Sequence, residues 1–498
     1  MRKLVILLHR YLGIALALLF VIWFASGFAI IYTGGMPELT ENARLISLPG
    51  LDLERVSVSP NQAQQLARAS SIPKLTTIMN RPAYRFSESG GSVVFADDGT
   101  VLSGAMISSR QIIADFTGAK EEVIERIGRI EEVDQWTIPL RSELPLEKFR
   151  VNDGSGTEVY VSPRWGQVLL VTDSRDRFLA WIGAIPHWLY FVDLRRNTAL
   201  WTEVVVWLSS LGTILVSLGI VLIFIQLRRT RPFSFSGAIP YKGIMRWHFL
   251  TGLFFGLITL TWVFSGLLSM DPYPWTRARG LAFDQSIMHG GEVNLERFDT
   301  ISLQLTGQEL SGIVNSSQIK EIEFKRIQGE YFFYLTIPSS ESSWGFTKTL
   351  VNLNNLQAKN DLFSTSFILQ QLAQNLEHEI LASEVLQEYD NYYYSRPSSN
   401  SPSAPLPVLR IDFDDADRSS IYVNLNTGEL AGQTNRMRRI ERWLYNGFHS
   451  LDFQFWYGSR PLWDIGIILL LSGGLLLALI GAYIGIKRLF RNTRALIS

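Results

Sequence analysis

Four stretches of the chain are almost wholly apolar. They run near residues 4–32, 202–226, 247–270 and 462–486. A helix needs roughly 20 residues to cross the roughly 30 Å of hydrocarbon in a bilayer, so each stretch is long enough to span a membrane. The first stretch resembles a secretory signal, but its length and a near-copy deep inside the chain favour a retained helix. The pattern therefore predicts a membrane protein with four transmembrane helices.

Charge divides the segments between these stretches into two kinds. Residues 228–246 and 487–498, together with Arg2, Lys3 and Arg10, carry 12 basic residues and no acidic one. The positive-inside rule places both ends of the chain and the 228–246 loop in the cytoplasm. All 46 acidic residues lie beyond the first stretch, and the two long segments are jointly acidic. We expect these segments to face the periplasm from a bacterial inner membrane.

The apolar stretches and their flanks occur twice. A shift of 239 residues superposes His9 and His248, Trp23 and Trp262, Ser26 and Ser265, and Gly27 and Gly266. A shift of 262 residues superposes Trp181 and Trp443, His187 and His449, Trp201 and Trp463, and Gly219 and Gly481. Such self-similarity indicates a tandem repeat. Each half would contain a span, an outer domain, a Trp-x5-His segment and a second span.

The repeat predicts where the histidines lie. Each half has an even number of spans, so both halves enter the membrane in the same sense, related by an axis along the membrane normal. His9 and His248 would share a depth near the cytoplasmic face. His187 and His449 would share another depth, near the outer face.

The two outer segments have the pattern of α+β modules. Residues 93–102, 159–169 and 421–430 each read as a β-branched strand, a turn with glycine and a second strand. Ser59 can cap a helix that has proline in its first turn. Residues 363–389 are predicted to form a longer amphipathic helix.

These predictions divide the chain into eight parts. They are transmembrane helix 1 (1–34), outer domain 1 (35–177), a histidine segment with transmembrane helix 2 (178–227), a cytoplasmic loop (228–246), transmembrane helix 3 (247–270), outer domain 2 (271–438), a histidine segment with transmembrane helix 4 (439–486), and a cytoplasmic tail (487–498).

Composition narrows the chemistry. The chain has no cysteine, which excludes disulfides, iron–sulfur clusters, zinc–thiolate sites and haem attached through a CxxCH sequence. No G-x-G-x-x-G fingerprint occurs between a predicted strand and helix, so a bound nicotinamide is not expected. We expect no nucleic-acid partner.

The recurring sequences resemble the PepSY-associated transmembrane proteins. The features that carry the resemblance are the His9-Arg-Tyr-Leu-Gly start of a span, its echo at His248, the Trp-x5-His segments and the Asp/Asn-x-x-Gly hairpins. The resemblance covers residues 4–490 and implies an α-helical membrane protein: four transmembrane helices in a tandem repeat, with PepSY-like α+β periplasmic domains. Members include inner-membrane reductases that release iron from siderophores and carry b-type haem. This chain has Tyr-Asn-Gly-Phe-His449 where many members have His-Thr-Gly.

The resemblance implies haem ligation by His9, His187, His248 and His449. The chain has only six histidines, and these four fall at repeat-related membrane-border positions. Buried imidazole is costly in a membrane without partners, and neutral imidazole can ligate haem iron. Trp23 and Trp262 each lie 14 residues after a histidine, on the same helix face, and could wall a cofactor cavity. Arginines near the membrane edges could pair with haem propionates: Arg10, Arg195, Arg196, Arg246 and Arg460.

Other interpretations stay open for these residues. Histidine and tryptophan also serve as interfacial anchors without a metal, and large aromatic side chains often only fill helix-bundle cores. Ser26, Ser265, Gly27 and Gly266 are read as positions for close helix packing. A zinc or non-haem iron site made from the four histidines is disfavoured because two depths separate them.

The predicted function is that of a haem b oxidoreductase, with two haems, that moves electrons across the bilayer. It would reduce a periplasmic ferric siderophore or another iron complex and release ferrous iron, with a quinol or a protein as electron donor. No catalytic acid or base is needed. The alternatives are a non-enzymatic PepSY scaffold that restrains a partner protein, and a transporter.

Overall fold

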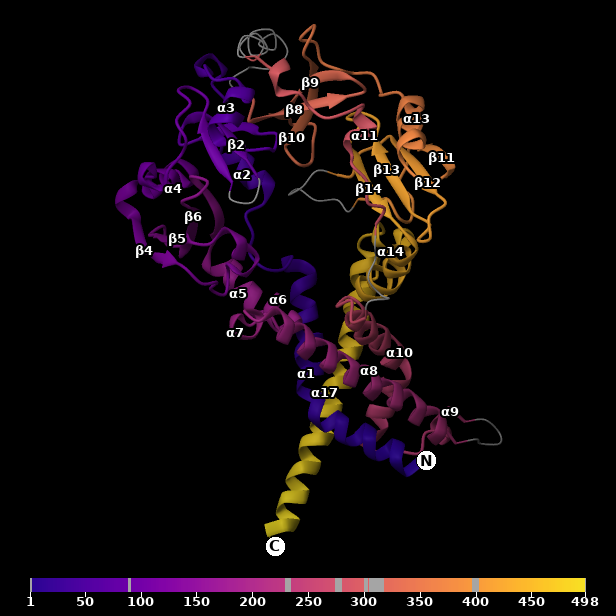
Figure 1. Cartoon of the computed structure of the whole chain (residues 1–498). Helices are drawn as coiled ribbons and strands as arrows, with labels where there is room; N and C mark the ends of the chain where they lie inside the picture. The colour runs from indigo at the N-terminus through magenta and orange to yellow at the C-terminus, as the bar shows by residue number, and fades with distance from the viewer. Residues whose placement is uncertain are drawn as a thin grey trace. The chain divides into compact units, whose positions relative to one another are not determined.

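The computed structural model describes residues 2–87, 91–228, 234–273, 280–299, 303, 318–395 and 403–497 (Figure 1). The chain divides into two compact units. The membrane unit comprises Met1–Met36, Arg175–Ala278 and Met437–Ser498. The β-rich unit comprises Pro37–Ser174 and Arg279–Arg436.

The membrane unit is built on four long apolar helices. They are α1 (Arg2–Thr33), α8 (Thr198–Gln226), α10 (Ile244–Leu268) and α17 (Leu462–Ile497). Each is long and apolar enough to cross a membrane, which confirms the four predicted stretches. None contains proline, which would remove a helical hydrogen bond. α17 continues to Ile497, so most of the predicted tail is helical, as its lysine, arginine and leucine residues favour.

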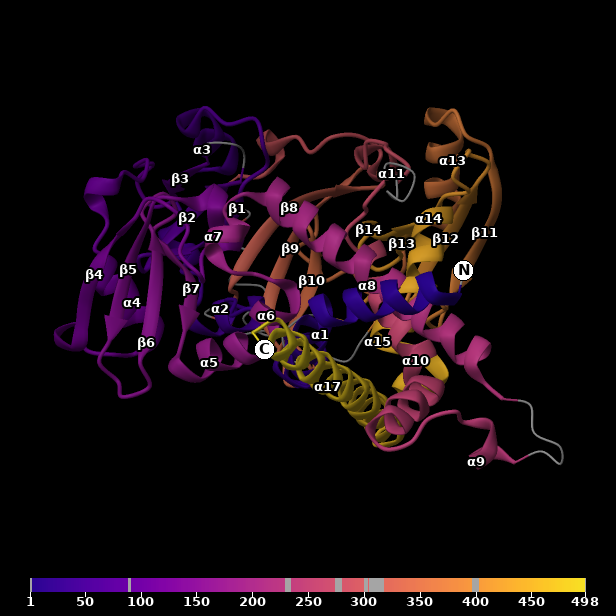
Figure 2. The same cartoon turned by 90° about the horizontal axis from the view of Figure 1, so that it is seen from below.

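Glycines let aromatic side chains enter the helix contacts. Within the membrane unit, α1 and α10 each pack against both α8 and α17 (Figures 1 and 2). A Cβ on Gly474 would come within 2.1 Å of the Phe24 ring, and one on Gly473 within 2.2 Å of the Phe255 ring. Small residues allow close approach of helices in membranes. This glycine pair therefore accommodates an aromatic ring from each neighbour of α17.

Short helices precede α8 and α17 in the chain, where it passes from the β-rich unit into the membrane unit. Those before α8 are α5 (Ser174–Ile182), α6 (Ala184–Trp188) and α7 (Val192–Arg195); those before α17 are α14 (Arg436–Glu441), the π-helix η9 (Arg442–Gly447), α15 (Phe448–Ser450) and α16 (Gln454–Tyr457). Trp201 donates its indole N–H to the Trp188 carbonyl at 3.0 Å, and Trp463 donates to Leu451 at 2.9 Å. Each connecting segment is thereby fixed to the first turn of the span it precedes. A further short helix, α9 (Phe235–Ala238), precedes α10.

The described residues of the β-rich unit form three antiparallel sheets (Figure 2). The six-stranded sheet has the order β10 (Phe346–Asn352), β9 (Glu330–Pro338), β8 (Glu321–Ile327), β1 (Lys74–Ile78), β2 (Arg81–Phe86), β3 (Ser92–Phe95). One four-stranded sheet is β4 (Ile124–Ile130), β5 (Leu146–Val151), β6 (Thr157–Ser162), β7 (Gln167–Thr172). The other is β11 (Ile380–Leu386), β12 (Val408–Phe413), β13 (Ser420–Asn424), β14 (Leu430–Thr434). The helices of the β-rich unit include α2 (Glu41–Ser47), α3 (Pro60–Ala67), α4 (Ser109–Thr117), α11 (Ser286–His289) and α13 (Thr365–Asn375).

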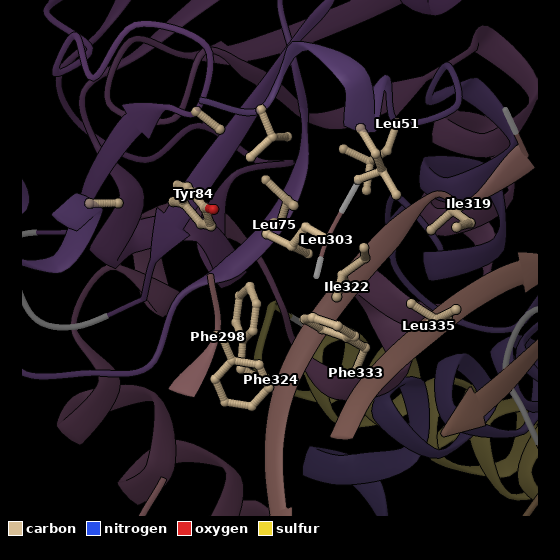
Figure 3. Close-up of a cluster of buried hydrophobic side chains, with 14 of the residues drawn as sticks. Leu51, Leu75, Tyr84, Phe298, Leu303, Ile319, Ile322, Phe324, Phe333 and Leu335 are labelled. Carbon is tan, nitrogen blue, oxygen red and sulfur yellow. The ribbon is translucent and has the colours of Figure 1, made fainter. Parts of the chain in front are cut away.

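The six-stranded sheet joins the two outer segments of the chain. β1 and β8 pair antiparallel, with Leu75 opposite Ile322, so three strands from each segment form one sheet. One face of this sheet carries a shared apolar core, in which Leu75 and Tyr84 meet Phe324 and Phe333 (Figure 3). The opposite face carries charges at the junction. Sequence reasoning expects two separate modules and does not predict this shared sheet.

Several local predictions are confirmed, and one is wrong. Residues 159–169 form the β6–β7 hairpin and residues 421–430 the β13–β14 hairpin. Ser59 caps α3 in a full capping box. The helix expected over 363–389 instead ends at Asn375, and β11 follows it. Residues 380–386 gain backbone hydrogen bonds to β12, which outweigh their helical pattern.

Candidate functional site

The outer histidines, His187 and His449, are held by the same contacts in both halves of the membrane unit. The Nδ1 atom of His187 lies 3.2 Å from the Trp23 carbonyl oxygen and 3.1 Å from the Ser26 hydroxyl. The Nδ1 atom of His449 lies 3.2 Å from the Trp262 carbonyl oxygen and 3.1 Å from the Ser265 hydroxyl. Because a carbonyl oxygen only accepts, Nδ1 carries the proton in both rings. The Nε2 lone pair of each imidazole is then available to a ligand.

Local backbone structure aims these two rings at α1 and α10. In the first half, Gly183 has non-helical backbone angles, φ −111° and ψ −94°, and separates α5 from α6. In the second half, η9 precedes α15. Both segments then turn through a leucine in the left-handed region, Leu189 with φ 53° and Leu451 with φ 50°. The ring centroids of His187 and His449 lie 6.2 Å apart, with planes at 70°.

The inner histidines, His9 on α1 and His248 on α10, form a second pair. Their ring centroids lie 6.3 Å apart, with planes at 39°. His9 donates from Nδ1 to the Leu215 carbonyl at 3.0 Å. The buried Nδ1 of His248 has no hydrogen-bond partner among the residues that the structure describes. The structure thus brings the four histidines together in the two pairs expected from their depths.

A glycine faces each of the four rings. A Cβ on Gly27 would lie 4.0 Å from Cε1 of His187, and one on Gly266 3.6 Å from Cε1 of His449. At the inner pair, a Cβ on Gly219 would lie 2.9 Å from Cε1 of His9, and one on Gly481 3.5 Å from Cε1 of His248. These four glycines come from all four apolar helices. Their missing side chains leave the space that the imidazoles occupy.

Of the two tryptophans predicted to wall a cavity, Trp262 lies in the core of the helix bundle and Trp23 is half-buried against it. Trp23 lies 6.0 Å from Phe20, and Trp262 lies 5.7 Å from Phe24, between ring centroids. Trp262 is 8% exposed, and its indole N–H has no partner within the described part of the chain. Their backbone carbonyls, as stated above, accept from the outer histidines. A cavity-lining role for the indole rings stays a prediction.

The arginines predicted at the membrane edges fall into two groups. Arg195 lies over the Trp201 ring at 4.5 Å and donates to Thr198 at 2.7 Å. Arg460 lies over Trp463 at 4.2 Å and forms an ion pair with Asp464. Arg246, near His248, donates to the Ser236 hydroxyl at 3.1 Å.

Arg10 is half-buried, directly after His9 on α1. Arg196 lies 4.0 Å from the Asp193 carboxylate. The arginines at the inner level are therefore Arg10 and Arg246, whereas Arg195, Arg196 and Arg460 already have aromatic or acidic neighbours.

One aromatic contact distinguishes the two outer histidines. The Tyr445 ring stacks on His449, with centroids 5.2 Å apart and planes at 24°. The repeat places Gly183 at the equivalent position of the first half. A Cβ on Gly183 would lie 3.1 Å from the Leu179 carbonyl oxygen, which leaves little room for a side chain.

Sequence reasoning missed the two serines as partners of the histidines. Ser26 and Ser265 are 2% and 1% exposed, and their hydroxyl oxygens contact imidazole nitrogen. Their equivalence under the 239-residue shift, the same that relates His9 and His248, was the available signal. This equivalence does not reveal that the serines contact His187 and His449, because those two histidines are related by the other shift, of 262 residues.

The imidazoles of each pair could hold a metal ion through two nitrogen ligands. Metal–nitrogen bonds are about 2 Å long, so centroid separations of 6.2 and 6.3 Å leave room for one ion between two rings. A backbone carbonyl on Nδ1 is the usual partner of a metal-binding histidine. Over the described ranges, no group of three or more histidine and acidic side chains could hold a metal ion. The arrangement therefore fits two-histidine ligation of a haem iron better than a zinc site.

In the described part of the chain, four long apolar helices, a β-rich unit and two histidine pairs define a membrane protein whose helix bundle brings four imidazoles together two by two. The chain belongs to the family described as PepSY-associated TM region, whose model matches residues 6–307. The match includes His9, His187 and His248 and confirms the resemblance seen in the sequence. A comparison with curated proteins gives no match.

Proposed function

We propose that this protein is a haem b oxidoreductase that moves electrons across a bacterial inner membrane. The observation that carries the proposal is the pairing of all four repeat-related histidines inside the helix bundle. The 17 residues from His9 to Ser26, the contact of His187, span about 25 Å of α1, so the two pairs lie near opposite ends of the spans. Haem held between two imidazoles supplies one-electron chemistry, cycling between ferric and ferrous forms.

The residues of the chain have distinct tasks in this proposal. His187 and His449 would bind one haem and His9 and His248 the other, each through the ring nitrogen that carries no proton. Trp23 and Trp262 exclude water and lipid between the two levels. Arg10 and Arg246 pair with propionates at the inner level, where guanidinium groups can form bidentate contacts with carboxylates.

The topology and the substrate are the finer parts of the proposal. The basic flanks favour cytoplasmic termini and a periplasmic β-rich unit. The substrate is a ferric siderophore or another periplasmic iron complex. One-electron reduction of its ferric iron to ferrous iron releases the metal, because ferrous iron binds a hard-oxygen chelator more weakly. The electron donor is a quinol or a protein.

We infer further that the chain is a tandem repeat. Tyr160 donates to Asp134 at 2.8 Å and Tyr422 to Asp390 at 3.4 Å. A basic side chain, Lys148 or Arg410, lies at the 262-residue equivalent position beside each carboxylate, at 3.3 Å and 3.9 Å. With the matching histidine contacts, these pairs support duplication of the whole unit of span, outer domain and span.

An absorption spectrum of the detergent-purified protein, before and after dithionite, tests the function. We expect a Soret band and two haems per chain. His248→Ala should halve the haem content. His289→Ala is the matched control, because His289 binds only the Gly428 carbonyl in the β-rich unit, and it should leave both haems in place. A colourless protein from haem-replete cells would refute the proposal and favour a scaffold.

A further inference from the structure

The two histidine pairs differ in how many acceptors hold their Nδ1 protons. Each outer ring has two, a tryptophan carbonyl and a serine hydroxyl. At the inner pair, His9 has the Leu215 carbonyl alone. His248 has none within the described residues. Within the part of the chain that the structure describes, four acceptors thus serve the outer pair and one serves the inner pair.

The serine hydroxyls are oriented as acceptors toward the rings. Ser26 has two acceptors for its own proton, the Ile22 carbonyl at 2.7 Å and the Trp23 carbonyl at 3.1 Å. Ser265 donates to the Trp262 carbonyl, at 3.1 Å. Each hydroxyl oxygen therefore directs a lone pair at the Nδ1 proton, which is shared between two acceptors. The same arrangement occurs independently in both halves of the membrane unit.

We propose that Ser26 and Ser265 are positioning residues that hold the Nδ1 protons of His187 and His449, and thereby give the outer centre a more negative reduction potential than the inner centre. Acceptors on the far nitrogen of a metal-binding histidine fix its tautomer and raise its basicity. A more basic ligand stabilises the oxidised metal, which lowers the potential. The ordering of the potentials rests on the proposed function, whereas the hold on the protons does not.

Nitrogen-15 NMR of histidine-labelled, dithionite-reduced protein tests the hydrogen bonds from the Nδ1 protons to the serines directly. It does not require haem. Ser26→Ala leaves the Trp23 carbonyl as the sole acceptor for His187. Since one hydrogen bond is lost, the His187 Nδ1 proton should exchange with water about fivefold faster, with His449 unchanged. Ser265→Ala should speed exchange of the His449 Nδ1 proton and leave that of His187 unchanged. Ser26→Thr, which keeps a hydroxyl, should retain the slow exchange rate at His187. Ser269→Ala is the matched control, because Ser269 lies one turn beyond Ser265 and binds only the Gly266 carbonyl.

Equal exchange rates in Ser26→Ala, Ser269→Ala and the unchanged protein would overturn the positioning role. So would a proton on Nε2 of the outer histidines in the unchanged protein. Either result would stand whether or not the protein binds haem.

A redox titration of the haem-loaded protein tests the ordering. Loss of an outer-sphere partner commonly weakens metal binding about tenfold or more. Where a tenfold loss falls on the oxidised state alone, a one-electron midpoint rises by about 59 mV. The Ser26→Ala Ser265→Ala double variant should raise the more negative midpoint by that order and leave the other unchanged. Movement of the more positive midpoint would overturn the ordering. A colourless protein would refute the proposed function and the ordering with it, while the exchange rates would still decide the role of the serines.

Discussion

At the scale of single residues, the glycines that face the imidazoles constrain the site as much as the histidines do. A methyl group on Gly219 would lie 2.9 Å from the His9 ring, closer than carbon atoms approach without a shift. Overpacking of a tight core costs typically about 1–3 kcal/mol. We therefore expect Gly219→Ala to displace His9, to lower the thermal stability of the membrane unit and to reduce the haem content. Thermal unfolding in detergent and haem quantification measure both effects.

Gly481 provides the matched control for this substitution. It is the repeat equivalent of Gly219, but a methyl group there would lie 3.5 Å from His248, an ordinary contact distance. Gly481→Ala should therefore retain stability and haem. Equal damage from both variants would show that helix contact in general, not the His9 ring, limits the space.

The pairing of the four histidines could be predicted from sequence self-similarity, whereas their hydrogen-bond partners could not. Two sequence shifts relate four of the six histidines in register. The bond between Ser26 and His187 depends on how the α6 segment lies against α1, which no local pattern encodes. The same limit applies to the stacking of Tyr445 on His449. Repetition thus identifies positions, and tertiary contact decides their roles.

At the scale of elements, buried charges stabilise the junction between β1 and β8. Glu321 is 3% exposed, and its carboxylate binds Arg44 at 2.8 Å and Lys74 at 3.2 Å. Removal of one partner from a buried ion pair costs roughly 3–5 kcal/mol. Lys74 is 35% exposed and can be rehydrated, so Glu321→Ala should cost about 3 kcal/mol, the lower end. Urea unfolding followed by near-ultraviolet circular dichroism measures the loss.

Glu131→Ala is the matched control for Glu321→Ala. Glu131 pairs with Arg129 at 2.7 Å, but both side chains are largely exposed. Exposed pairs contribute about 0–1 kcal/mol, so this variant should unfold close to the unchanged protein. Similar losses in the two variants would contradict a special role for the β1–β8 junction.

Charges at the same junction make the folding stability depend on pH in the acid range. Burial alone would raise the pKa of Glu323, but the ammonium groups of Lys325, Lys74 and Lys348 outweigh it and lower the pKa from 4.5 to about 2. A lowered carboxyl pKa stabilises the folded state fully above the unfolded value of 4.5, and this contribution is lost as the pH falls through about 2. Thermal midpoints recorded from pH 6 to pH 2 should therefore fall across this window.

Glu323→Gln separates this group from the other acids. It should lower stability at neutral pH and flatten the fall below the unfolded pKa. Glu330→Gln, at an exposed position of β9, should leave the whole profile unchanged. A profile of Glu323→Gln parallel to that of the unchanged protein would contradict the assignment of the pH dependence to Glu323.

Helices and hairpins with a strong local sequence pattern could be predicted. Strands that form only by pairing with residues far away in the sequence could not. The apolar stretches and the hairpins with glycine turns have patterns that few other structures share. Residues 380–386 also fit a helical pattern, and only pairing with β12 makes them a strand. Likewise, nothing local in Lys74–Ile78 or Glu321–Ile327 indicates that they pair with each other across more than 240 residues.

At the scale of the whole molecule, the orientation of the spans decides which side would receive electrons in the proposed function. Both termini are expected in the cytoplasm because twelve basic residues and no acidic one lie at that side of the spans. The chain contains no cysteine, so a single introduced cysteine reports its own side without background. Lys242→Cys, in the loop before α10, and Glu131→Cys, after β4, are at exposed positions of the two proposed sides.

A membrane-impermeant maleimide should label Glu131→Cys in intact spheroplasts and label Lys242→Cys only after the membrane is opened. Both variants should label fully in detergent, which confirms that each thiol is accessible. Labelling of Lys242→Cys in intact spheroplasts would reverse the topology. His187 and His449 would then lie at the cytoplasmic face, and the β-rich unit could not receive a periplasmic iron complex. The direction of electron flow therefore follows from the side on which these two cysteines react.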